Sequence, residues 1–207
     1  FGELASKTIN PESLIELQRN LVLSHAAGVG EPLEVGEARG ILFLRANELA
    51  RGHSAVRPIV VKSMADFLNA GLAPVIPSRG SVGASGDLAP QAHMALALIG
   101  LGEVFFKGRR LGAAAALSRC KLKPLRLEAK EGLSLLNGTQ GMQAVAGLAL
   151  ERAYRVWNAA QLAGAMSLEA MMGTPEPFDE AIQRLKPHPG QIEAAAQLRG
   201  YLADSQI

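Results

Sequence analysis

The chain is poor in the residues that cross-link a fold or hold a metal ion. Its 207 residues include one cysteine, Cys120, so no disulfide can form within the chain and a reducing, cytoplasmic location is expected. Cys120 has a basic residue on either side, which leaves open a reactive thiol or an ordinary one. His53, His93 and His188 have no partners at metal-ligand spacing, so they are expected to be structural and the sequence predicts no metal site.

Aromatic residues, an excess of one charge and long apolar runs are also scarce. Aromatics make up 4% of a chain that is 48% hydrophobic and rich in Ala and Leu, which favours packed helices over sheets. Lys and Arg number 21 against 19 Asp and Glu, so no nucleic-acid partner is expected. The apolar runs 94–101 and 144–150 are shorter than the ~20 residues of a membrane helix. No membrane partner and no signal peptide are therefore expected.

The apolar periodicity predicts a mostly α fold with at most one short β-hairpin. Asn10-Pro11-Glu12 has the residues of a helix start. Residues 72–79 are expected to be extended, and 104–106 and 109–111 to pair as a hairpin. The expected helices are 10–28, 36–50, 58–71, 88–100, 112–119, 131–136, 139–172, 178–185 and 190–202.

Glycine, in contrast, is abundant and concentrated at residues 80–87, which read GSVGASGD. Glycine is needed where φ is positive or where another group approaches the backbone closely. A phosphate-binding loop would need a lysine after the glycines, and Asp87 would repel a phosphate, so no nucleotide is expected. A nucleophile elbow, Gly-x-Ser-x-Gly, would need a glycine where Asp87 stands.

A third alternative is chemistry on the backbone itself. The Gly86 amide nitrogen, which no side chain hinders, can attack the Ala84 carbonyl carbon and close a five-membered ring with loss of water. Loss of the Ser85 hydroxyl then leaves an exocyclic methylidene group, a strong electrophile made from uncharged residues. A strained turn would press the nitrogen against the carbonyl carbon. The remaining alternative is a glycine-rich turn that only leads into the next helix.

Residues 80–94 closely resemble the signature of the histidine and aromatic amino acid ammonia-lyases. Further segments resemble that family in the same order: 17–30 (LQRNLVLSHAAGVG), 51–58 (RGHSAVRP), 74–77 (PVIP), 130–140 (KEGLSLLNGTQ) and 187–192 (PHPGQI). The resemblance covers essentially the whole chain and implies the helical bundle fold of that family. Residues 1–207 are then expected to be a single partial lyase domain, the N-terminal catalytic portion, with both ends of the full-length protein missing.

The resemblance implies elimination of ammonia from L-histidine to give trans-urocanate, a step of histidine catabolism. In that family Ala-Ser-Gly becomes the prosthetic group 4-methylidene-imidazol-5-one, here from Ala84, Ser85 and Gly86, without a metal or nucleotide. Asp87 either caps the helix expected to begin near Leu88 or helps the ring to form. The family's basic tyrosine belongs to a segment whose last two letters match Phe1-Gly2, so that tyrosine is not in this chain.

Two further residues match substrate-binding positions of that family. Asn137 matches a position near the substrate and the ring, whereas the residues alone favour a helix C-cap before Gly138. His25 matches the substrate-selecting position, at which members that prefer histidine have Ser-His. An imidazole can exchange a hydrogen bond with the substrate's imidazole. From the residues alone, His25 is a helix-terminal histidine bound to a carbonyl.

Other functions stay open at this point. Within the family, the alternatives are a phenylalanine or tyrosine ammonia-lyase or an aminomutase. The resemblance implies a homotetramer whose active sites draw residues from more than one chain. A different class of function is therefore a non-catalytic piece that acts only as an assembly module. Such a piece would contain the ring precursor without an operative site.

Overall fold

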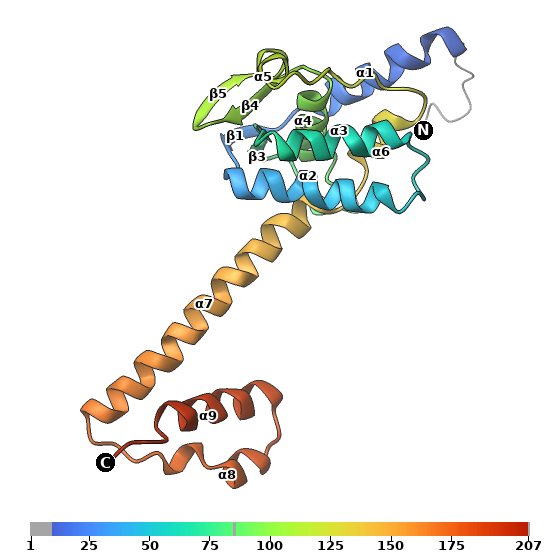
Figure 1. The fold of residues 1–207 in the computed structure, drawn as a ribbon. Coiled ribbons are helices and arrows are strands. Elements are labelled where there is room, and N and C mark those ends of the chain that lie inside the picture. Colours follow the sequence, from blue (N-terminus) through green and yellow to red (C-terminus); the bar gives the residue numbers. More distant parts are fainter. Residues whose placement is uncertain (1–9, 85, 207) are drawn as a thin grey trace. The chain divides into compact units, whose positions relative to one another are not determined.

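Most of the chain is helical, as the sequence predicted. The computed structural model describes residues 10–84 and 86–206 (Figure 1). Its helices are α1 (Leu14–His25), α2 (Val35–Ala50), α3 (Pro58–Asn69), α4 (Leu88–Leu98), α5 (Ala113–Arg119), α6 (Glu131–Leu136), α7 (Gln140–Ala170), α8 (Glu180–Arg184) and α9 (Pro189–Tyr201), with short 3-10 helices at Pro11–Ser13 and Glu176–Phe178. The expected helices are confirmed to within a few residues at their ends.

The strand content exceeds the single hairpin that was expected. The strands are β1 (Val29–Pro32), β2 (Ala73–Pro74), β3 (Pro77–Arg79), β4 (Glu103–Phe106) and β5 (Arg109–Gly112). The hairpin β4–β5 is confirmed, but β2 pairs with β4 as well, and β1 pairs with β3 in a second sheet. These additional ladders join short, proline-containing segments that lie far apart in the sequence. A local alternation pattern cannot reveal pairing of that kind.

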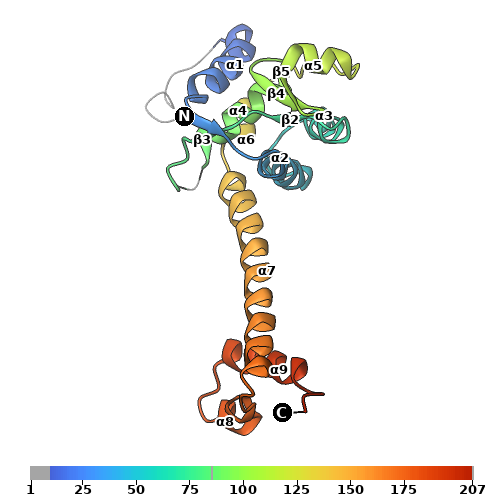
Figure 2. The ribbon, with the colours of Figure 1, turned by 90° about the vertical axis from the view of Figure 1, so that its left-hand side faces the viewer.

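The chain divides into two compact units, Phe1–Leu148 and Ala149–Ile207. In the first unit, α4 is the central element, since it contacts α1, α2, α3, α5 and α6. Figure 2 shows α4 among these helices. Its apolar residues are buried along most of its length, namely Ala92, Met94, Ala95, Ala97 and Leu98. The helix that follows the glycine loop is thus anchored in the core.

The second unit contains the rest of α7 together with α8 and α9. Ala165 of α7 and Ala195 of α9 are buried within it. Asp179 caps α8 by accepting a hydrogen bond from the Ala181 amide at 2.8 Å, and Gln183 donates to the Pro177 carbonyl at 2.7 Å. The prediction that residues 1–207 form a single partial lyase domain stays a prediction.

Candidate active site

The glycine loop, residues 80–87, leads from β3 into α4. Its start is fixed by the pairing of β3 with β1, and its end by the first turn of α4 at Leu88. Gly83 has a φ of +67°, a conformation that favours glycine. Val82 is 84% exposed, so the tip of the loop projects from the first unit. Ser85, the central residue of the predicted ring, lies outside the described residues.

Asp87 joins both ends of this loop to a second helix. Its carboxylate is fully buried and accepts a hydrogen bond from the Ser81 hydroxyl at 2.6 Å. The other carboxylate oxygen accepts from the backbone amide of Met142 at 2.7 Å, in the first turn of α7. Asp87 occupies the N-cap position of α4 but makes no side-chain hydrogen bond there. The carboxylate therefore closes the loop and caps α7 rather than α4.

The turn between α6 and α7 packs directly against the glycine loop. The Asp87 amide donates to the Gly138 carbonyl at 2.7 Å. A Cβ added to Gly86 would lie under 3.0 Å from Oδ1 of Asn137, so any larger residue at position 86 would require the Asn137 side chain to shift. Asn137 ends α6 as its C-cap residue and is exposed. The C-cap interpretation and the proximity to the predicted ring are therefore compatible.

Buried polar side chains of α2 and α4 also form hydrogen bonds with this turn. Gln91 of α4 donates to the Gly138 carbonyl at 2.6 Å and to Oε1 of Gln140 at 3.3 Å. Arg45 of α2 donates to the same Gln140 oxygen at 3.1 Å and to the Asn137 carbonyl at 3.0 Å. Burial lowers the pKa of Arg45, an effect that nearby Glu48 opposes. Helices α2 and α4 thus converge on residues 137–140.

His25 is the last residue of α1 and lies on the segment that runs past the start of the loop. Its Nδ1 is 2.8 Å from the Leu21 carbonyl, as the helix-terminal interpretation expected. Three residues later the Gly28 amide donates to Nε2 of His93 at 3.1 Å, and Gly28 packs against Gly80. Burial lowers the pKa of His93, which suits its role as an acceptor. Among hydrogen bonds of the described residues, none joins His25 to Gly86, Asp87 or Asn137.

The structure therefore brings Gly86, Asp87 and Asn137 together. Within the described part of the chain, His25 forms no hydrogen bond with any of the three. No sequence pattern predicted the roles of Ser81, Arg45, Gln91 and Gln140. One signal could have revealed Arg45, because the buried positions of α2 are Ala38, Ile41, Leu42, Arg45 and Leu49. A charged residue within such an apolar stripe needs buried partners.

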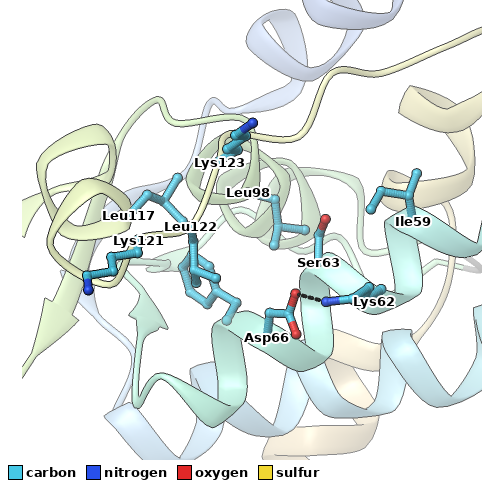
Figure 3. A pocket seen from close by; sticks show the side chains of 10 residues that line it. Ile59, Lys62, Ser63, Asp66, Leu98, Leu117, Lys121, Leu122 and Lys123 are labelled. Atoms are coloured by element: carbon cyan, nitrogen blue, oxygen red, sulfur yellow. Dashed lines mark hydrogen bonds and ion pairs between the residues drawn. The ribbon is translucent and has the colours of Figure 1, made fainter.

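Two of the cavities in the described part of the first unit are relevant to the site or contain charged side chains. One of about 220 Å³ lies beside the loop, and its lining includes Ser81 and Met142, the two donors to Asp87. Another of about 350 Å³ opens between α3, α5 and residues 121–123 (Figure 3). There Lys62 is paired with Asp66 at 2.6 Å, and Figure 3 shows the side chains of Lys121 and Lys123 directed away from that pair.

Neither metal-binding clusters nor membrane spans occur in the described residues. No group of three or more His, Cys, Asp or Glu side chains among residues 10–84 and 86–206 could hold a metal ion. No helix in the same part of the chain is both long and apolar enough to cross a bilayer.

The sequence comparison decides the family. The model of the aromatic amino acid lyases matches residues 1–207. The chain belongs to the aromatic amino acid lyase family. It is 56% identical to a histidine ammonia-lyase of Stigmatella aurantiaca over 207 residues, which are all of this chain and 41% of that relative. This member of the lyase family thus spans about two fifths of the length of the relative that it matches.

Solved lyase-family structures share the fold. A tyrosine aminomutase from Streptomyces globisporus aligns with a TM-score of 0.91 at 42% identity, over 97% of this chain and 38% of that one. A histidine ammonia-lyase from Trypanosoma cruzi aligns with a TM-score of 0.89 at 41% identity, over 95% of this chain and 38% of that one. The fold of this lyase-family chain is therefore common to lyases and aminomutases.

Proposed function

We propose that this chain is the part of a histidine ammonia-lyase in which the prosthetic group forms from Ala84, Ser85 and Gly86. The protein would eliminate ammonia from L-histidine to give trans-urocanate in the cytoplasm. The observation that supports this most directly is the packing of Asn137 against Gly86, next to the buried carboxylate of Asp87. The high identity to a histidine ammonia-lyase along the whole chain supports the choice of activity.

The residues present fit the ring that the family uses. Ring closure needs a bond between the Gly86 nitrogen and the Ala84 carbonyl carbon. One water leaves with the Ala84 oxygen and the amide hydrogens of Ser85 and Gly86, and a second leaves with the Ser85 hydroxyl and its α-hydrogen. Glycine at position 86 gives the unhindered nitrogen that closure needs and also leaves room for the Asn137 side chain, which an added Cβ would force to shift. Once formed, the ring supplies an electrophilic carbon to which the amino acid attaches.

Asp87 and Asn137 would do different work at this site. Both carboxylate oxygens of Asp87 accept hydrogen bonds: the one from Ser81 joins the two ends of the loop, and the one from Met142 fixes the loop on α7. This arrangement supports a role in orienting the groups that cyclise. The exposed amide of Asn137 offers two N–H donors and one acceptor to the substrate or to the ring oxygen.

His25 supports L-histidine over other amino acids as the substrate. Because a carbonyl can only accept, Nδ1 of His25 must be the donor in its contact with Leu21. In the neutral imidazole, Nε2 is then an acceptor, and a substrate imidazole has an N–H to donate. Phenylalanine has no such group, and a site left with an unpaired polar atom discriminates strongly.

Exposed apolar residues support assembly with further chain. Along α7, Leu150, Tyr154, Val156 and Met166 are largely exposed, as is Val82 at the tip of the loop. Apolar surfaces of this kind mark interaction sites. They are consistent with a homotetramer in which other segments complete each active site. Light scattering of the full-length protein would give its oligomeric state directly.

The test is a substrate panel on the full-length protein. L-Histidine, L-phenylalanine and L-tyrosine are assayed separately by the ultraviolet absorbance of the unsaturated acid, and the mass of the intact chain is measured alongside. Loss of two waters localised to Ala84–Gly86, with urocanate from L-histidine, is the expected result. A β-amino acid product would instead identify an aminomutase. No product from any substrate would leave only the assembly role.

A further inference from the structure

Arg45 is an unusual residue for the core of a helical protein. It lies in the middle of α2, and only 2% of its side chain is exposed. Its carboxylate partner, Glu48, is 40% exposed and accepts a hydrogen bond at 2.6 Å. Burying a guanidinium group is costly unless its donors are satisfied, so the rest of its partners show what the charge is used for.

Those partners all belong to one short stretch of chain. Nη2 donates to the carbonyls of Ser134 and Asn137, the latter at 3.0 Å. Nη1 donates to Oε1 of Gln140 at 3.1 Å. One rigid, planar group therefore ties the end of α6, the following turn and the first residue of α7 together.

Gly138 makes this contact possible. A Cβ added at Gly138 would lie under 3.0 Å from both Nη1 of Arg45 and Oε1 of Gln140. The turn therefore lacks a side chain where the guanidinium group approaches it. The same turn accepts a hydrogen bond from the Asp87 amide and places Asn137 against Gly86. Arg45 and the glycine loop therefore both contact this turn.

We propose that Arg45 is a positioning residue for ring formation, because it holds Asn137 against Gly86 through the turn at residues 137–140. This inference rests on the proposed function. Arg45 touches neither the ring residues nor the substrate. Its effect is to fix the backbone of Asn137, so that the amide restricts where the Gly86 nitrogen can lie relative to Ala84.

A second arginine provides a matched control. Arg57 also binds a backbone carbonyl, that of Arg126 at 2.7 Å, and a buried carboxylate, that of Glu131 at 2.8 Å. It likewise joins segments that are far apart in the sequence. Its partners lie at the start of α6, however, and not in the turn that contacts Gly86. Loss of Arg57 should therefore cost stability without displacing Asn137.

The experiment compares Arg45→Lys, Gln140→Met and Arg57→Lys in the full-length protein. Lysine keeps the charge of Arg45, but its single ammonium group cannot reproduce the planar fork by which the guanidinium group reaches several fixed oxygens. Folded protein is isolated by size exclusion, and the fraction of chains lacking two waters is measured by intact mass. The kcat and KM for L-histidine and the urea midpoint are measured on the same samples.

We expect Arg45→Lys to lower the ring-bearing fraction or kcat by about tenfold to a hundredfold, the effect of a shift on the order of 1 Å at a reacting group. Gln140→Met should lower the same two quantities by a smaller factor. It replaces Arg45→Lys as the test variant if Arg45→Lys does not fold. Arg57→Lys should lower the urea midpoint alone. Wild-type ring content and kcat in folded Arg45→Lys or, failing that, in Gln140→Met would overturn the inference, as would an equal loss in Arg57→Lys. Absence of the ring from the wild-type protein would count against the proposed function instead.

Discussion

The carboxylate of Asp87 caps a helix that begins more than fifty residues later in the chain, at the backbone amide of Met142. Asp87 stands next to the first residue of α4 but makes no capping bond with it. Its other oxygen holds Ser81 at the far end of the glycine loop. A single side chain therefore sets the span of the loop and its position on the N-terminus of α7.

Replacing Asp87 by Asn tests this arrangement. The amide keeps an acceptor for one donor but presents N–H groups where the carboxylate accepted the second. We expect the free energy of unfolding to fall by about 1–3 kcal/mol, the cost of an unsatisfied buried group. Ring content, measured by intact mass, should fall with it. Asp179→Asn is the control, because Asp179 caps α8 in the other unit, and it should leave ring content unchanged. Wild-type ring content in the Asp87 variant would show that the loop does not depend on this carboxylate.

Two glycines of α7 should respond oppositely to the same substitution. A Cβ on Gly141 would lie 2.9 Å from Oδ2 of Asp87, whereas one on Gly147 would meet nothing within 4 Å. We expect Gly141→Ala to destabilise the protein by about 1–3 kcal/mol through overpacking. Gly147→Ala should stabilise it by about 0.5–1 kcal/mol, since alanine is the better helix former. Urea unfolding measures both, and equal shifts would contradict the close approach at Gly141.

The spacing of apolar residues, together with proline and glycine at the helix ends, was enough to predict the helices of this fold. Pro58 at the start of α3 and Gly71 after its end are examples of signals that depend on neighbouring residues alone. The pairing of Val29 with Arg79 could not be predicted in this way. Neither segment alternates clearly, and the ladder depends on how α1 and α4 pack together.

The same holds for the candidate site, where local sequence signals predicted the segments but not the contacts between them. The loop at 80–87 and the turn after Asn137 were both visible in the sequence, but only the family resemblance, and no local pattern, placed Asn137 near the predicted ring. Their contact depends on the buried side chains of Arg45 and Gln91, which lie on different helices. A polar residue in an apolar stripe indicates that a buried partner exists, but only the tertiary structure shows which partner it is.

Substrate choice can be tested at His25. His25→Leu removes the acceptor that we assign to the substrate imidazole. We expect kcat/KM for L-histidine to fall by about 10- to 100-fold, consistent with the loss of one hydrogen bond to the substrate. The value for L-phenylalanine should rise or stay constant. Equal losses for both substrates would indicate that His25 stabilises the end of α1 and does not select the substrate.

Glu131 should make the first unit sensitive to acid. Burial acts to raise the pKa of Glu131, but hydrogen bonds from the Arg57 side chain and from the backbone amides of Glu128 and Arg57 outweigh it, as the Arg57 charge does also, so the pKa lies below its ordinary value. A carboxylate with a depressed folded-state pKa contributes stability above its unfolded-state pKa of about 4.3. That contribution is lost as the pH falls through the lower folded-state value.

Glu131→Gln should therefore be less stable than the wild type at neutral pH, by about 1–3 kcal/mol. The two unfolding free energies should converge in acid, because a protonated Glu131 offers Arg57 no more charge than glutamine does. Urea titrations at a series of pH values measure this difference. Glu151→Gln is the control, since Glu151 pairs with Arg155 on the surface and should change stability by less than about 0.5 kcal/mol at every pH. Parallel curves for wild type and Glu131→Gln would show that the Arg57–Glu131 pair does not set the acid response.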